Sequence, residues 1–584
     1  MSETRVQADV AIVGGGVAGC MTALHLLESN PDLKVAVIEK STLKRGGNAA
    51  TGMDHYIAVS PKFFTRKKRF FMQVFQNIIL PQLTGRCEAG MTDFFGPEIM
   101  EEGYEGLMKL ESLGIGVRDS EGALRLVNAA GGSALWIEGA EIKPILAARL
   151  KKLGAIALER TSAQEVLTHG GRAAGVVGFN SRTGQFVRVD APAVLISTGT
   201  CDRFWEPVLR DCSGAPFDTA SNPYMTGEGQ VAALNAGGEV FGLEFAMTTI
   251  SPVDWATPGI SGLLSAGCRL RNALGEEFMG KYDPLGARLG APARELIIYG
   301  MHRESLEGRA PIYIDTSSLS PADIAEMKNA WSNEVPLMHG YVEKKGIVLG
   351  RDAVEAEIHM VALLPHICNR PDMQSGVPGL FAAGDSGATL CMAFVGAVMG
   401  GARAAKGIAE YLGDARPVEP GSADGQAEEA RERMFSYLRR EDGPRWTEVE
   451  RELQRTMTRY FGLTRNENGM RSGRDRVAEI AERAAQARAT NPHELMRLHE
   501  TLAMVELAGI TADAALIRTE TRVAGQATYH VRSDYPKTSR EWDRLLVASK
   551  RDGKVSLEAR KATASKAKFV MKGLRMLFLG PKFN

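Results

Sequence analysis

The sequence lacks closely spaced cysteines. Its 584 residues include seven cysteines, and none of them forms a C-x-x-C pair. Iron–sulfur clusters and structural zinc sites are usually held by such pairs, and disulfide frameworks are typical of short secreted chains. We therefore expect neither a metal site nor a disulfide framework in this chain.

An excess of charge of either sign is also absent. Lys plus Arg and Asp plus Glu each number 70, so the formal net charge is zero. Nucleic-acid-binding domains are usually basic. The balance therefore predicts no nucleic-acid partner, although it leaves local basic patches open.

The start of the chain lacks the pattern of a secretion signal. MSETRVQADV carries acidic and polar residues where a signal peptide has a basic end and an apolar run, which predicts a cytoplasmic protein. Residues 10–27 and 386–402 contain no Lys, Arg, Asp or Glu, but Gly and turn signals interrupt both stretches. We interpret them as buried segments of a folded protein rather than as membrane spans.

A dinucleotide-binding pattern is present near the start. Ala8–Val13 is a short apolar run, typical of a strand buried in a parallel sheet, and Gly14–Gly19 follows it directly as G-x-G-x-x-G. Gly14 permits a tight turn, Gly16 lets the backbone approach a pyrophosphate, and Gly19 allows the next helix to pack closely.

The next segments complete this pattern. We expect a helix over Cys20–Glu28 and a second strand over Lys34–Ile38, which is followed by Glu39, twenty residues after Gly19. A carboxylate at this position is placed to accept hydrogen bonds from an adenosine ribose. The order of elements predicts a site for NAD or FAD; the alternative is a glycine-rich turn in an unrelated α/β protein.

Two later apolar strands favour FAD. Ala193–Gly199 and Val377–Asp385 resemble the return strands of flavoproteins that have two dinucleotide-binding domains. In those proteins the acid of the last strand holds the ribityl chain of FAD. The resemblance implies the same role for Asp385.

With these segments in view, the chain resembles the flavoprotein subunits of the succinate dehydrogenase, fumarate reductase and adenylylsulfate reductase superfamily, from residue 8 to about residue 542. The other matching motifs, in the family's order, are Gly46–Gly52, Thr226–Gly229, Pro292–Glu295, Ile312–Asp315, Glu520–Arg522 and Tyr529–Pro536 with Trp542. One such motif would be weak, but the ordered set is specific.

The resemblance implies a bound FAD. The residues that it places at the cofactor are Gly14, Gly16, Val17, Ala18, Gly19, Glu39, Lys40, Ser41, Gly46, Gly47, Asn48, Gly52, Thr198, Gly199, Glu228, Gly384, Asp385 and Ala397. Family members with covalent flavin use a histidine in the loop that is here Arg45–Ala50, which contains none. We therefore expect non-covalent FAD.

For reduction of a C=C bond, the resemblance implies that Arg294 donates a proton while hydride arrives from the flavin, with Glu295 as its partner in proton relay. Arginine is an unusual acid because its pKa exceeds about 12, so such a role needs desolvation and a relay. The alternative is a structural Arg–Glu pair.

The chain departs from fumarate reductases at two substrate-binding segments. Glu244–Thr249 contains no histidine, and Cys391–Gly396 contains no arginine. A dicarboxylate would lose two of its usual contacts, so succinate and fumarate are disfavoured and an apolar or uncharged substrate is favoured. Met247, Met392 and Phe394 either line the pocket or belong to the core.

Two histidines precede the last expected FAD strand, where the family often has a substrate-facing histidine. They are His359 and His366. The register of this short segment leaves open which of them has a catalytic role, and each can equally be a structural histidine.

The expected fold class is α/β, with a Rossmann-like FAD-binding domain, an inserted α+β capping domain and a C-terminal helical domain. The predicted units are residues 1–215 and 346–415 (FAD-binding), 216–345 (capping), 416–545 (helical) and 546–584 (a basic–apolar tail). Pro252–Gly262 has the composition of a lid or hinge, 416–427 that of a linker, and 428–509 the periodicity of a helix bundle.

Two basic–apolar segments are candidate sites for partner binding. They are Pro61–Phe71 and Phe569–Lys582. The family commonly exchanges electrons with an iron–sulfur subunit, and a ferredoxin-type partner fits the same role. Either segment docks such a partner, contacts a membrane surface peripherally, or is a solvated face over local core.

The favoured function is an FAD-dependent oxidoreductase that transfers hydride between flavin N5 and a substrate carbon, reducing or forming a C=C bond. One alternative is adenylylsulfate-reductase-like chemistry, which the apolar Cys391–Gly396 segment disfavours. Another is a non-catalytic electron-transfer or assembly subunit.

Overall fold

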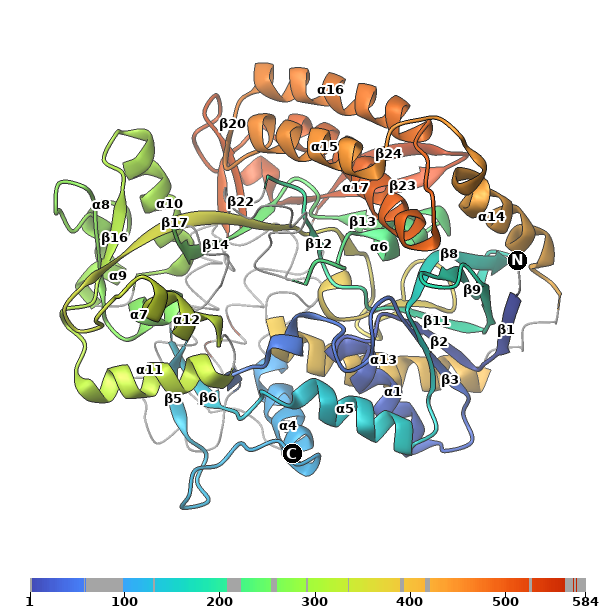
Figure 1. The fold of residues 1–584 in the computed structure, drawn as a ribbon, viewed down its shortest axis with the longest axis horizontal. Helices are drawn as coiled ribbons and strands as arrows, with labels where there is room; N and C mark the ends of the chain where they lie inside the picture. Colours follow the sequence, from blue (N-terminus) through green and yellow to red (C-terminus); the bar gives the residue numbers. More distant parts are fainter. Residues whose placement is uncertain are drawn as a thin grey trace.

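A computed structural model describes residues 3–56, 58, 98–129, 132–206, 222–253, 260–289, 292–333, 336–388, 393–414, 421–524, 528–561, 571 and 574 (Figure 1). The segment Pro61–Phe71, Cys391, Met392 and nearly all of Phe569–Lys582 lie outside these residues, so the expectations for them stay predictions.

A five-stranded parallel sheet forms the first layer. Its order is β19 (Leu380–Ala382), β11 (Ala193–Ile196), β2 (Val10–Val13), β3 (Val35–Glu39) and β7 (Ile156–Glu159). Four of the strands are buried throughout, which explains their continuous apolar runs. Because α-helices cover one face of this parallel sheet, the structure confirms a mixed α/β fold.

The two faces of this sheet have different covers. Val10, Ile12, Val35 and Val37 face a core built with α1 (Val17–Ser29), α5 (Ile142–Lys152) and α13 (Ala393–Asp414), which lie together in Figure 1. The other face packs on a sheet of order β1-β10-β9-β8. These strands are Glu3–Gln7, Phe186–Asp190, Arg172–Asn180 and Thr161–His169.

A second large sheet joins the middle of the chain to its last third. Its strands are β15 (Arg269–Arg271), β16 (Ile312–Asp315), β17 (Ala353–Leu363), β14 (Ala246–Pro252), β22 (Thr528–Arg532) and β20 (Thr464–Arg465), with β12 (Cys201–Asp202) and β21 (Arg522–Ala524) attached. Its nearby helices are α7 (Ser261–Ser265), α8 (Met279–Tyr282), α9 (Pro284–Leu289), α10 (Arg294–Leu306), α11 (Pro321–Asn333) and α12 (Leu337–Lys344).

The strands of this sheet come from three of the predicted units. β17 lies in the predicted FAD-binding unit and β22 in the predicted helical unit, and both pair with β14 in the predicted capping unit. The eleven-residue β17 runs antiparallel to β14 and β16. Because these strands are distant in the sequence, composition does not predict their pairing.

The last third begins with four helices. They are α14 (Asp424–Ser436), α15 (Trp446–Tyr460), α16 (Glu467–Ala485) and α17 (Pro492–Ile517). α14 starts inside the predicted linker 416–427. Side chains of Asn466 and Asn491 accept hydrogen bonds from the first turns of α16 and α17, which is the usual way to begin a helix.

The first part of the predicted tail 546–584 is folded into a sheet. β23 (Arg544–Arg551) and β24 (Lys554–Lys561) form a hairpin, and β23 pairs with β13 (Glu239–Phe241), which in turn pairs with β18 (His366–Ile367). Leu546 and Ala548 face one core cluster and Leu545 and Val547 face another, so both faces of this part of β23 are buried.

The remaining elements lie around the sheets. They are β4 (His55–Tyr56), β5 (Leu126–Ala129), β6 (Gly132–Trp136), α4 (Glu98–Ser112), α6 (Glu228–Asn235), and the short 3-10 helices η1 (Asn48–Thr51), η5 (Gly384–Ser386), η7 (Tyr437–Arg439) and η9 (Arg540–Trp542). Within the described ranges, no helix is both long and apolar enough to span a bilayer.

Candidate functional site

The glycine turn lies between β2 and α1, as predicted. Gly14 has φ +102°, and a Cβ there would lie 2.4 Å from the Ser197 carbonyl oxygen. A Cβ on Gly19 would lie 2.1 Å from the Gly14 oxygen, so close packing needs both glycines. Gly16 differs, because a Cβ there would meet nothing closer than 3.8 Å. The chain thus leaves space for one methyl group beside Gly16, at van der Waals distance from Gly47 and Ser197.

The first turn of α1 faces this space without a side-chain cap. Gly16 is the N-cap residue and no acidic residue occupies the first turn. An uncapped helix N-terminus favours an anion because its amide groups and the helix dipole both point at it. The lack of a side chain at Gly16 and the uncapped first turn together fit the diphosphate of a dinucleotide.

Glu39 lies at the turn with a fixed orientation. Its Oε2 accepts a hydrogen bond from the Gly15 amide at 2.8 Å, and its Oε1 accepts from both the amide and the hydroxyl of Ser41 at 2.7 Å. These bonds hold the carboxylate at the carboxyl end of β3, where the sequence predicts contact with the adenosine ribose.

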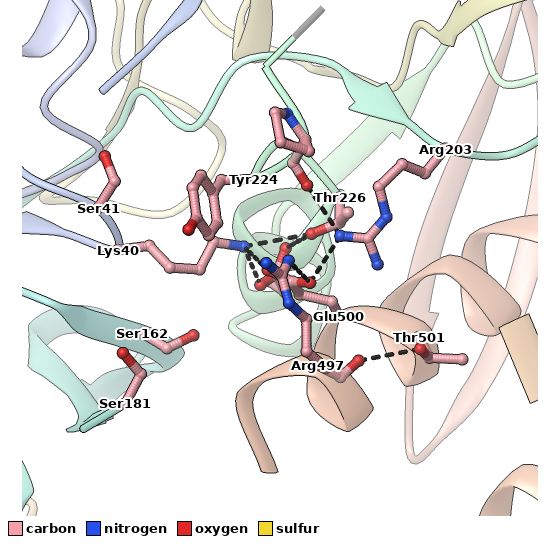
Figure 2. A network of polar contacts seen from close by, with 12 residues as sticks. Lys40, Ser41, Ser162, Ser181, Arg203, Tyr224, Thr226, Arg497, Glu500 and Thr501 are labelled. Carbon is pink, nitrogen blue, oxygen red and sulfur yellow. Dashed lines mark hydrogen bonds and ion pairs between the residues drawn. The ribbon is translucent and has the colours of Figure 1, made fainter. Parts of the chain in front are cut away.

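Lys40 and Glu228, two predicted cofactor residues, belong to a buried ion network. Figure 2 shows Lys40 in this network with Glu500, Arg203 and Arg497. Lys40 Nζ lies 2.7 Å from Glu228 Oε1 and 2.8 Å from Glu500 Oε1. Arg203 and Arg497 also bind Glu500, each at 2.8 Å. The charged groups of Lys40 and Glu228 therefore join β3 and α6 to α17.

Glu500 is the centre of this network. Burial alone would raise the pKa of its carboxyl, but Lys40, Arg203 and Arg497 overcome burial and lower the pKa well below its usual range. Removing one partner of a buried ion pair leaves an uncompensated charge.

We expect Glu500→Gln to lower the free energy of unfolding by about 3–5 kcal/mol, because three cations lose a shared partner. Urea denaturation measures this value. The control is Glu479→Gln on α16, whose exposed carboxylate pairs with the exposed Arg476; we expect a change of about 0.5 kcal/mol or less there. Equal effects of the two substitutions would contradict the central role of Glu500.

The loop Gly46–Gly52 lies against the glycine turn. A Cβ on Gly47, which has φ +79°, would approach Gly16 Cα to 2.9 Å. Asn48 Oδ1 accepts a hydrogen bond from the Asn222 amide at 2.9 Å. The structure thus brings the predicted flavin loop to the glycine turn at Gly16.

A third segment reaches the same place from β11. The Gly199 amide donates to Ser386 Oγ at 2.8 Å, and Gln230 Nε2 donates to the Gly199 carbonyl at 2.7 Å. Thr198 lies beside both side chains. Ser386 and Gln230 were not among the predicted site residues. Ser386 could have been inferred from its position directly after the predicted residue Asp385.

Gly384, Asp385 and Ala397 complete this end of the site. A Cβ on Gly384 would lie 2.9 Å from Ala18 Cβ and 3.9 Å from Ala397 Cβ. Asp385 Oδ1 is buried and has no hydrogen-bond partner among the described residues. Such an acceptor requires a donor, and a chain of ligand hydroxyls supplies donors. The residues present therefore fit FAD.

The pKa of Asp385 predicts a pH dependence. Burial raises this pKa from its usual value to about 7. The folded protein then holds a proton that the unfolded chain loses at lower pH, so the contribution of Asp385 to stability is full below the unfolded pKa and is lost as pH rises through about 7. We expect the wild-type apoprotein to lose more of its melting temperature between pH 5 and pH 8 than Asp385→Asn. Parallel melting curves for the two proteins would contradict this prediction.

A set of polar side chains shares one face of the second sheet. Thr249 on β14 pairs with His359 on β17, and Ser251 lies two residues further along β14, so all three point to the same side. Arg294, at the start of α10, donates to Thr249 Oγ1 at 3.4 Å. The structure therefore places Arg294 against Thr249, which is the strand partner of His359, and the sequence alone could not establish this.

His359 is buried and uncharged. Burial lowers its pKa to about 4. Its Nδ1 and the Ser251 hydroxyl are both buried and have no hydrogen-bond partner within the described ranges. This face thus offers a neutral imidazole, hydroxyls and the Arg294 guanidinium to a ligand.

Glu295 is buried beside Arg294 at the start of α10. Tyr529 on β22 donates its hydroxyl hydrogen to the Glu295 carbonyl at 2.8 Å. Burial raises the pKa of this Tyr529 hydroxyl well above its usual value, so it remains a donor. This bond fixes the first turn of α10, and with it Arg294.

His366 lies elsewhere. It belongs to β18, in a different sheet from β17, and its Nδ1 lies 3.0 Å from the Gly387 carbonyl. Its ring packs on Phe241 at 5.3 Å. Burial lowers its pKa to about 4. The structure therefore places His366 behind the Gly384–Ser386 turn and does not bring it to Arg294.

Met247 and Phe394 contact the protein interior. Phe394 packs edge-on against Tyr56 at 5.8 Å, and Met247 packs on Val361 and Ala362. These contacts favour core packing for Phe394. Met247 lies where β14 and β17 shift register, beside the segment that pairs with β12 after Gly199. The polar side chains of β14 therefore begin next to the segment that the sequence predicts at the flavin.

Among the described residues no group of three or more His, Cys, Asp or Glu side chains is placed to hold a metal ion.

Comparison with protein families gives two extended matches. A family described as an FAD binding domain matches residues 99–364, and one described as the fumarate reductase flavoprotein C-terminus matches residues 450–573. A further family, Thi4, matches residues 1–62, which include the glycine turn.

Similar full-length proteins agree with these matches. An uncharacterized FAD-dependent oxidoreductase of Methanocaldococcus jannaschii is 23% identical over 92% of this chain and 95% of its own length. A fumarate reductase flavoprotein subunit of Mycobacterium tuberculosis is also 23% identical, over 92% and 93%.

Solved structures share the fold. Adenylylsulfate reductase from Archaeoglobus fulgidus superposes with a TM-score of 0.82 at 21% identity, covering 96% of this chain and 97% of that one. The FrdA subunit of Escherichia coli quinol fumarate reductase superposes with a TM-score of 0.78 at 19% identity, covering 98% and 99%.

Proposed function

Because the chain belongs to the superfamily of succinate dehydrogenase, fumarate reductase and adenylylsulfate reductase flavoproteins and is an FAD-dependent oxidoreductase, we propose that it transfers hydride between flavin N5 and a substrate carbon, reducing or forming a C=C bond. The single observation that carries this proposal is the shared polar face of Arg294, Thr249 and His359. Its strand β17 pairs with β12, which follows Gly199, so the face is connected to the Gly199 side of the cofactor site.

The cofactor residues have defined tasks. The uncapped first turn of α1 binds the diphosphate, Glu39 binds the adenosine ribose, and Asp385 accepts from the ribityl hydroxyls. The loop Gly46–Gly52, without histidine, holds the ring non-covalently. Bound FAD supplies the hydride.

Arg294 is the proton donor to the substrate carbon next to the one that receives hydride. Its guanidinium is half-buried, and Thr249 Oγ1 accepts from its NH2 group at 3.4 Å. Glu295, the next residue of α10, returns the proton to Arg294. Desolvation and this relay make a transient proton loss from arginine tolerable.

The substrate is uncharged or carries one negative charge. A dicarboxylate needs two cationic clamps, whereas this face offers Arg294 together with a neutral His359. His359 and Ser251 have hydrogen-bonding atoms to spare, which suits a carbonyl or hydroxyl oxygen. An α,β-unsaturated carbonyl compound satisfies these groups and places its C=C bond for hydride addition.

The electron partner that fits this proposal is an iron–sulfur or ferredoxin-type protein. The second candidate reaction is that of adenylylsulfate reductase, because the structure of that enzyme superposes with a TM-score of 0.82. That reaction needs basic groups for a sulfate and a phosphate, and the face around Thr249 and Ser251 supplies hydroxyls and one guanidinium instead.

Anaerobic reoxidation of the photoreduced protein tests these alternatives. The flavin absorbance is followed after mixing with an uncharged enone, a singly charged enoate, fumarate, or oxidised ferredoxin; a second sample of oxidised protein receives AMP with sulfite. We expect the enone or enoate to reoxidise the flavin faster than fumarate does. Reoxidation by ferredoxin alone would favour an electron-transfer subunit, and flavin reduction by AMP with sulfite would favour the second candidate.

A further inference from the structure

One buried cation near the glycine turn has no part in the function described so far. Lys143 is the second residue of α5, and its side chain is fully buried. Its Nζ donates hydrogen bonds to the Gly15 carbonyl and to Cys20 Sγ, the latter at 3.2 Å. Lys143 therefore reaches the glycine turn from the side of α5.

Lys143 lacks the partner that buried lysines usually have. No carboxylate of the described residues lies within 4.0 Å of its Nζ, whereas buried Lys40 has two such partners. Lysine is almost never fully buried unless it is paired. A negative charge is therefore missing near Lys143.

Gly15 places the cation next to the cofactor. Its amide donates to Glu39 Oε2 at 2.8 Å, and its carbonyl accepts from Lys143, so the peptide groups of one turn residue join both charges. The following residue is Gly16, the N-cap residue of the uncapped helix α1. An anion bound at the first turn of α1 would lie in the field of Lys143 with protein, not water, between them.

The start of α5 is fixed independently of Lys143. The Gly139 amide donates to the Met53 carbonyl at 3.0 Å, just after the loop Gly46–Gly52. A Cβ on Gly139 would lie 2.5 Å from that same carbonyl oxygen. The helix is thus held against the flavin loop by its backbone, and substitution of Lys143 need not displace it.

We propose that Lys143 is a cofactor-positioning residue whose buried charge selects the diphosphate of FAD at the glycine turn. The diphosphate supplies the missing counter-charge, and the Gly15 carbonyl keeps the ammonium group at a fixed place behind the turn. The proposal rests on FAD binding at this turn and is independent of the substrate and of the direction of hydride transfer.

Lys143→Met removes the charge and retains an unbranched side chain. We expect FAD to leave this variant about tenfold to a hundredfold faster than it leaves the wild type, measured as the rise of flavin fluorescence on dilution. Lys143→Arg, which keeps the charge, restores most of the binding. The matched control is Lys152→Met at the exposed end of the same helix, for which we expect the wild-type rate.

A comparison of ADP with adenosine separates a charge effect from simple support of the turn. Calorimetry on the apoproteins should show ADP binding weakened about tenfold to a hundredfold by Lys143→Met, and adenosine binding within about twofold of wild type. Equal weakening of both ligands would show that Lys143 only supports the turn, and unchanged ADP binding would also overturn the proposal.

A second variant protects the test against misfolding. If Lys143→Met does not melt cooperatively, Lys143→Gln keeps a donor for the Gly15 carbonyl without the charge, and the same two ligands decide. Neither ligand reacts with flavin or substrate. A failure of this proposal is thus distinguishable from a failure of the proposed reaction.

Discussion

Arg294→Ala slows reoxidation of the reduced flavin by substrate about a hundredfold to ten-thousandfold and leaves the FAD content of the purified protein unchanged. The rate falls because general acid catalysis by one positioned side chain contributes about that much. FAD is retained because Arg294 lies at the start of α10, at the second sheet, whereas the diphosphate and ribose sites lie at β2, β3 and α1. Stopped-flow absorbance gives the rate, and the visible spectrum gives the FAD content.

Two further variants complete this prediction. Thr249→Val removes the oxygen that accepts from Arg294, and we expect a smaller loss of rate because the guanidinium remains but is less well oriented. Arg303→Ala on the exposed side of the same helix serves as the control, since its partner Glu307 is also exposed. A wild-type rate in Arg294→Ala would leave a structural Arg–Glu pair as the role of Arg294 and Glu295.

Gly16→Ala abolishes stable FAD binding without destabilising the apoprotein. A methyl group on Gly16 would contact nothing closer than 3.8 Å, and φ there is −65°, so the folded chain accepts alanine. The same methyl group occupies the space through which the diphosphate must approach the backbone. Thermal melting of the apoprotein and flavin absorbance of the purified protein measure the two effects.

Gly14→Ala provides the contrast, because its methyl group would lie 2.4 Å from the Ser197 oxygen at a φ of +102°. We expect this variant to lose both FAD and folding stability. If Gly16→Ala retains FAD with wild-type affinity, the diphosphate does not lie at this turn.

The cofactor half of the site was predictable because its signals are local. The apolar run Val10–Val13, the glycines after it and Glu39 lie within about thirty residues, and Gly14, Gly19 and Glu39 each have close contacts or hydrogen bonds in one turn. The later segments at Gly199 and Gly384 were found by resemblance to the family. Their positive φ values and close contacts with Met225 and Ala18 explain why glycine occurs there.

The second sheet was not predictable because its pairing is non-local. β14, β17 and β22 lie far apart in the sequence, and only their hydrogen bonds assign them to one sheet. The register of β14 against β17 also contains an irregularity between Met247 and Thr248. A shift of one residue would turn His359 to the other face, so the sequence alone left His359 and His366 equivalent.

The interactions of buried polar residues whose partners are distant in the sequence could not be predicted, for a related reason. Lys143 is separated from Gly15 by 128 residues and has no motif around it. Lys40 and Glu228 were expected at the cofactor, but Glu500, 460 residues after Lys40 in the numbering, engages Lys40 directly. Charge partners of this kind require the fold before they can be named.

A crystal structure of the FAD-loaded protein tests the central claim most directly. We expect the diphosphate beside Gly16 and the flavin ring between the loop Gly46–Gly52 and the face of Arg294, Thr249 and His359. A ring that points away from this face, with no space for a substrate between flavin N5 and Arg294, would contradict the proposed hydride transfer.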